Sequence, residues 1–88
     1  MLTKKVTVVN PEGLHLRPVG VLAKAVKAYP ESEVLIRFAG KEINAGAVMQ
    51  LMTAGIKMGA EVELAVSGGD EQAVLDELVS LFESGFNK

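Results

Sequence analysis

The 88-residue chain has no cysteine and a single histidine, which excludes disulfides and thiolate chemistry and makes a zinc site unexpected. Aromatic residues make up only 5% of the chain and the formal net charge is −2. Nucleic-acid-binding surfaces need a basic face and stacking rings, so this composition argues against one. We therefore expect partners among proteins and small anions, with no metal and no cofactor.

Long apolar runs are also missing. Only a few apolar residues separate Met1–Lys5 from Asn10-Pro11, too few for a signal-peptide core or for a span of the bilayer. We expect a soluble, unexported, cytoplasmic protein without stable membrane association. The length predicts one domain, residues 1–88, with a modest core.

The apolar pattern predicts seven elements. Period-two alternation indicates strands at residues 2–9, 33–38 and 61–67, and Ala39-Gly40 predicts a hairpin into a strand at 41–44. Helical spacing predicts a helix over 19–29, with Pro18 in its first turn, and another after the N-cap candidate Asp70, with a stripe of Val74, Leu75, Leu78, Leu81 and Phe82. Gly68-Gly69 lacks the lysine of a phosphate loop and is interpreted as a turn.

A short helix is expected between Ala47 and Gly55. Val48, Leu51 and Met52 share one face, with Met49 beside them. Methionines in such a helix are usually core residues, but flexible thioethers also suit surfaces that fit several partners. The order β-α-β-β-α-β-α predicts an α+β open-faced sandwich, a four-stranded antiparallel sheet with three helices on one face.

Gly13-Leu14-His15-Leu16-Arg17-Pro18 is the stretch that carries chemistry. Imidazole titrates near neutral pH and is nucleophilic when neutral. His15 falls at the start of a predicted helix, where free N–H groups and the helix dipole attract anions, and Arg17 adds a guanidinium that fits phosphate oxygens. These residues favour a phosphoryl group carried on His15.

A lone histidine at this point is more often a helix cap or a surface residue. Two large apolar neighbours, Leu14 and Leu16, stand where loops usually have polar residues. Exposed leucines beside a histidine would indicate a docking surface.

The motif, its place after the first strand and the element order resemble HPr, the histidine-containing phosphocarrier family of the bacterial phosphotransferase system. The likeness extends to Phe38-Ala39-Gly40-Lys41, Asn44, the 49–52 segment and Lys57-Met58-Gly59-Ala60-Glu61. It implies that His15 is phosphorylated on Nδ1 by phosphoenolpyruvate-dependent Enzyme I, and that the group passes to the IIA unit of a sugar permease. The protein would be a carrier, not an enzyme, and a shuttling carrier is expected to be a monomer.

The resemblance also implies roles for neighbouring residues. Arg17 would neutralise the phosphoryl oxygens, N–H groups of Leu16 and Arg17 would bind them, and Pro18 would fix the helix start. The implied apolar docking surface, shared by donor and acceptors, consists of Leu16, Gly20, Val48, Met49 and Met52.

The chain departs from the family at two positions. Family members from low-GC Gram-positive bacteria carry a regulatory serine at the start of the second helix, where this chain has Ala47. We therefore predict no phosphoserine switch and no co-repressor role through this site. Leu16 is bulkier than the alanine common there and is expected to alter partner choice. The segment Leu81–Phe86 also resembles NPr, the paralogue in the nitrogen-related branch of the phosphotransferase system. The sequence therefore leaves open whether the chain serves the sugar branch or the nitrogen branch.

Three alternatives to the phosphocarrier function remain. An acylphosphatase-like hydrolase would need an arginine and several glycines in this loop without a histidine nucleophile. An RNA-binding module would need aromatic residues on the open sheet face, which is expected to carry Thr3, Lys5, Thr7, Glu33, Arg37, Glu61 and Glu63 instead. A paralogue that only docks would keep the surface without taking phosphate.

Overall fold

The structure, a computed structural model, describes residues 1–86. Its elements follow the predicted order β-α-β-β-α-β-α. They are β1 (Leu2–Thr7), α1 (Leu16–Lys27), β2 (Glu33–Phe38), β3 (Lys41–Asn44), α2 (Val48–Thr53), β4 (Glu61–Ser67) and α3 (Glu71–Glu83).

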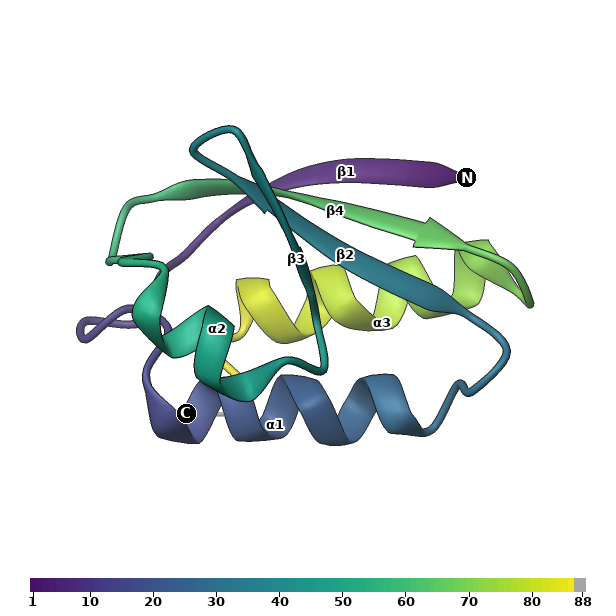
Figure 1. Cartoon of the computed structure of the whole chain (residues 1–88), viewed down its shortest axis with the longest axis horizontal. Coiled ribbons are helices and arrows are strands. Elements are labelled where there is room, and N and C mark those ends of the chain that lie inside the picture. The colour runs from purple at the N-terminus through teal and green to yellow at the C-terminus, as the bar shows by residue number, and fades with distance from the viewer. Residues whose placement is uncertain (87–88) are drawn as a thin grey trace.

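The four strands form one antiparallel sheet in the order β1-β4-β2-β3. β4 lies inside the sheet and pairs with β1 on one side, with Val6 opposite Val62, and with β2 on the other, with Ile36 opposite Leu64. The helices lie together on one side of the sheet, with α2 beside the first half of α1 (Figure 1). The predicted α+β open-faced sandwich is confirmed.

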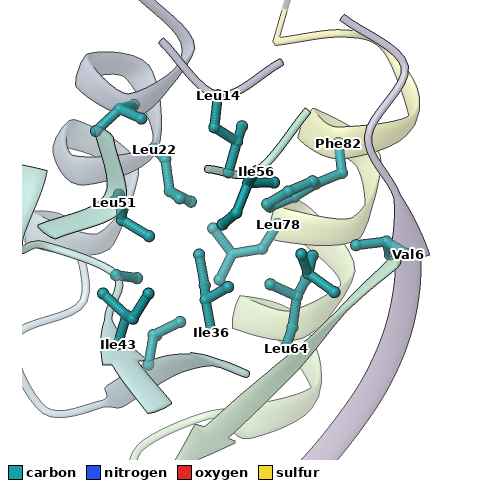
Figure 2. Close-up of a cluster of buried hydrophobic side chains, with 14 of the residues drawn as sticks. Val6, Leu14, Leu22, Ile36, Ile43, Leu51, Ile56, Leu64, Leu78 and Phe82 are labelled. Atoms are coloured by element: carbon teal, nitrogen blue, oxygen red, sulfur yellow. The ribbon is translucent and has the colours of Figure 1, made fainter. Parts of the chain in front are cut away.

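The core lies between the sheet and the helices. Alternate residues of β4, Val62, Leu64 and Val66, are at most 1% exposed, as the period-two pattern predicts. Figure 2 shows Leu64 and Ile36 from the sheet reaching toward Leu78 and Phe82 of α3. Burying each such side chain contributes about 1.5–3 kcal/mol, so this layer holds the helices on the sheet.

The opposite face of the sheet is a solvated, mixed-charge surface, as expected. The Arg37 guanidinium donates to Glu42 at 2.8 Å and to Glu63 at 3.0 Å, and these two carboxylates raise its pKa. The turn that leads into β3 has Ala39 at φ 53° and Gly40 at φ 79°, both in the left-handed region typical of a tight hairpin.

Several boundaries differ from the sequence prediction. α1 begins at Leu16, so Pro18 lies in its first turn as predicted, where the missing N–H of proline breaks no helical hydrogen bond. The same helix ends at Lys27, with Tyr29 one residue beyond the cap Ala28. β1 ends at Thr7, because Val8 bonds the 57–60 loop instead of β4, through Val8 N to Ala60 O at 2.9 Å.

Two predictions of exposure were wrong, those for Leu14 and Leu81. Leu14 is only 4% exposed and points into the core (Figure 2), and its backbone N–H donates to Ile56 O at 3.0 Å. Met52, for which core and surface interpretations were both open, is 39% exposed, and Val48 is half-buried; α2 buries only Leu51. Leu81, placed in the buried stripe of α3, is half-buried.

α3 begins as predicted. The Asp70 side chain accepts a hydrogen bond from Ala73 N at 3.2 Å and caps the helix. Gly68-Gly69 is a turn with both φ values positive. Glu71 accepts from the Gly68 N–H at 2.8 Å and lies 3.3 Å from the ammonium group of Met1.

We predict an acid-dependent loss of stability from Glu71. The Gly68 N–H, followed by the Met1 ammonium, lowers the pKa of Glu71 below 4.5. A carboxyl whose pKa is lower in the folded state stabilises the fold above its unfolded pKa, and this stabilisation disappears as the pH falls through the folded pKa. Urea unfolding of Glu71→Gln should therefore show a lower midpoint than the native chain at neutral pH and a shrinking difference below about pH 4. A difference that is constant with pH would contradict this.

Candidate functional site

His15 is the N-cap of α1, as the sequence predicts. Its backbone is extended, with φ −106° and ψ −165°, and its carbonyl accepts the first helical hydrogen bond, from Val19 N at 3.1 Å. The His15 side chain makes no capping hydrogen bond and is 37% exposed. The imidazole thus lies at the start of the helix but does not cap it through a hydrogen bond. Solvent or a partner protein can reach the ring.

The first turn of α1 supplies an anion cradle. The N–H groups of Leu16 and Arg17 lie in the first turn, where no helical carbonyl is available to them, and Pro18 has no N–H. No acidic residue occupies this turn to neutralise the positive end of the dipole. Arg17 is exposed at the same end. The site therefore brings together an imidazole, two N–H donors and a guanidinium.

The loop before His15 is anchored from both sides. Gly13 has φ +72° and its N–H donates to Asn10 O at 2.9 Å. The buried Asn10 side chain donates through Nδ2 to Gly85 O at 2.9 Å, which ties the loop to the end of α3. These bonds fix where the chain enters α1, and hence where the imidazole lies.

A surface cavity of about 560 Å³ opens beside His15. It brings together three of the predicted site residues, His15, Arg17 and Pro18, whereas Leu16 is outside it. The other lining residues come from the turn before His15, from α1 and from the chain end: Asn10, Pro11, Glu12, Val21, Gly85 and Phe86.

Glu12 is a site residue that the sequence interpretation missed, since it was assigned only to a turn. Its Oε1 lies 3.4 Å from Nε2 of His15, with the Glu12 side chain 78% exposed. The only signal in the sequence was the three-residue spacing between Glu12 and His15. This spacing predicts a contact only when the geometry of the intervening turn is known.

The predicted docking positions lie on α1 and α2, which pack against each other (Figure 1). Leu16 is 63% exposed and Met49 is 72% exposed. Gly20 lies one turn after Leu16, and a Cβ there would meet no heavy atom within 4 Å. Exposure of both methionines favours the surface interpretation of this helix over the core interpretation.

A larger cavity of about 800 Å³ lies at the β2–β3 hairpin, away from His15. Its lining residues include Arg37, which forms ion pairs with Glu42 and Glu63, and do not include a histidine. Over residues 1–86, no three His, Asp or Glu side chains gather as a metal site. No helix in the same range is long and apolar enough to cross a membrane.

Comparison with known proteins agrees with this geometry. Residues 2–84 match the family model described as the PTS HPr component phosphorylation site. Phosphocarrier protein HPr of Treponema pallidum is 33% identical over 88 residues, covering 100% of this chain and 99% of that protein. Phosphocarrier protein NPr of Proteus mirabilis is 29% identical, covering 97% and 94%.

Among solved structures, HPr-C-His from Thermoanaerobacter tengcongensis superposes with a TM-score of 0.93 at 30% identity. The match covers 100% of this chain and 98% of that one. The fold and these relatives place the chain in the class of small phosphocarrier proteins of the phosphotransferase system. The chain belongs to the HPr/NPr family of phosphocarrier proteins.

Proposed function

We propose that the chain accepts a phosphoryl group on Nδ1 of His15 from phosphoenolpyruvate-dependent Enzyme I and passes it to the IIA units of sugar permeases. The observation that carries this is the helix cap: a reachable imidazole stands at a helix start whose first N–H groups have no helical acceptor. A dianionic phosphoryl group on that ring meets the positive end of the dipole.

Arg17 and the backbone have separate roles in this proposal. The N–H groups of Leu16 and Arg17 bind phosphoryl oxygens, and the exposed Arg17 guanidinium offsets the negative charge on the phosphoryl group as it is transferred to and from His15. Pro18 fixes the first turn. The group is held and oriented for the next acceptor, so the chain itself acts as a carrier, not as an enzyme.

Leu16, Gly20, Val48, Met49 and Met52 form the proposed docking surface, adjacent to the site. An exposed apolar patch with two flexible thioethers suits donor and acceptor proteins in turn, and a small patch lets each of them leave quickly. We propose a cytoplasmic monomer as the working form.

The nitrogen branch is the second candidate, and a specific observation supports it: a relative named NPr covers nearly the whole chain. Ala47 is the N-cap of α2 and has no hydroxyl, so we propose that no serine switch acts at this point. Transfer assays with IIA proteins of each branch decide between the two.

The test is intact-mass spectrometry after incubation with phosphoenolpyruvate, magnesium and Enzyme I of either branch. We expect one acid-labile phosphoryl adduct on the native chain and none on His15→Ala. His15→Asn is the better control, because asparagine keeps a good N-cap and hence the helix start.

An adduct on His15→Asn, or no adduct on the native chain with either Enzyme I, would refute the proposal. Hydrolysis of acetyl phosphate by the native chain alone would favour the acylphosphatase-like alternative. Binding to Enzyme I without an adduct would leave the docking-only paralogue.

A further inference from the structure

We propose that Glu12 is a positioning residue that holds the proton of His15 on Nε2 and so leaves the lone pair on Nδ1. The proposal rests on the function proposed above and concerns the state of the ring before and after transfer. Its starting observation is the 3.4 Å between Glu12 Oε1 and His15 Nε2.

Glu12 reaches the ring from the turn that precedes α1. Gly13 follows it with φ +72° and the Gly13 N–H donates to Asn10 O, so the turn is fixed at both ends around Glu12. The Glu12 side chain is 78% exposed, and its 3.4 Å separation from Nε2 is slightly longer than a hydrogen bond. Such contacts are commonly long before a partner docks.

The chemistry of the two groups decides which nitrogen is protonated. An ionised carboxylate only accepts hydrogen bonds, so it is attracted to a nitrogen that bears a proton and repelled by one that presents a lone pair. Neutral imidazole has one nitrogen of each kind. A carboxylate at Nε2 therefore favours the tautomer with the proton on Nε2, which makes Nδ1 the nucleophile.

The transfer step then balances without moving a proton. The Nδ1 lone pair forms a bond to phosphorus while the bond between phosphorus and the donor atom breaks, and the electron pair of that bond stays on the donor. The ring of His15 now bears phosphorus on Nδ1 and the original proton on Nε2, so it has gained a positive charge. Glu12 faces this charge from the Nε2 side, opposite in sign and already in place. Transfer to the acceptor reverses each change.

The experiment reads the tautomer directly. His15 is the only histidine of the chain, so every imidazole signal in a ¹⁵N-labelled sample belongs to it. Long-range ¹H–¹⁵N spectra at about pH 8.5, where imidazoles are neutral, give the ratio of the Nε2–H to the Nδ1–H form. We expect Glu12→Ala to lower this ratio about two- to fivefold at low salt, the range typical of an exposed ion pair.

The matched control is Glu33→Ala, which removes an equal charge from the exposed first residue of β2, beyond the Lys27 end of α1. It should leave the ratio unchanged, and Glu12→Asp should restore part of it. In the Enzyme I assay, Glu12→Ala should slow adduct formation by a similar factor without changing the final amount of adduct.

A tautomer ratio in Glu12→Ala equal to that of the native chain would overturn the inference. So would an equal fall in Glu33→Ala, because the effect would then be one of net charge. Absence of any adduct on the native chain would refute the proposed function instead, and the tautomer ratio would still decide the role of Glu12.

Discussion

Replacing Gly13 with alanine is expected to lower the free energy of unfolding by about 2–5 kcal/mol and to displace the loop that carries His15. Gly13 has φ +72°, where a side chain costs about 1–2 kcal/mol. A Cβ at this position would lie 2.4 Å from Ile56 O and 2.8 Å from Lys57 Cα. Both are backbone atoms, so the two loops must separate, and the Leu14 N to Ile56 O hydrogen bond would be lost.

Two other glycines separate the causes of this effect. Gly40 has φ +79° but open space around it, so Gly40→Ala measures the backbone cost alone. Gly20 lies in α1 with open space, and Gly20→Ala should raise stability by about 0.5–1 kcal/mol. Urea unfolding midpoints should therefore fall in the order Gly20→Ala, native, Gly40→Ala, Gly13→Ala. A Gly13→Ala midpoint equal to that of Gly40→Ala would show that contact with the 56–57 backbone is unimportant.

Arg17→Ala is expected to slow phosphoryl transfer from Enzyme I about 10²–10³-fold, the cost typical of removing one charged or hydrogen-bonding group aimed at a developing anion. Arg17 is exposed at the start of α1 and lines the cavity beside His15, so its loss removes no core contact. We expect the free energy of unfolding to stay within about 0.5 kcal/mol of the native value. Single-turnover adduct formation is the measurement.

The chain contains a second arginine that serves as the control. Arg37 lies on the open face of the sheet between Glu42 and Glu63, so Arg37→Ala removes the same charge far from His15. Arg17→Lys keeps the charge but loses the planar fork, and should fall between Arg17→Ala and the native chain. If Arg37→Ala slowed phosphoryl transfer as much as Arg17→Ala, Arg17 would contribute only through the net charge of the chain.

Elements with strong local signals could be predicted from the sequence. Alternation in residues 61–67 identified β4, and Pro18 with the helical spacing behind it placed His15 at a helix start. Asp70 was predicted as a cap because its side chain can satisfy an N–H on its own helix. Each of these depends on residues a few positions apart.

Features that depend on distant segments could not be predicted. Leu14 is buried because residue 56 bonds its N–H, a contact no local pattern reveals. Met52 carried both a core and a surface interpretation, because the local pattern could not decide between them; in the folded chain α2 buries only Leu51. Glu12 reaches His15 through a turn whose shape depends on the positive φ of Gly13 and its close approach to the 56–57 backbone.

The strand order has a consequence for how the chain is made. β1 is synthesised first, yet within residues 1–86 its sheet neighbour is β4, the fourth strand in chain order. On the ribosome, β1 therefore waits unpaired while more than half of the protein emerges, and only the β2–β3 hairpin can form meanwhile. Closing such a long loop is slow, so the complete sheet forms late. The consecutive polar residues Thr3, Lys4 and Lys5 keep the unpaired strand polar, which disfavours pairing with other nascent chains.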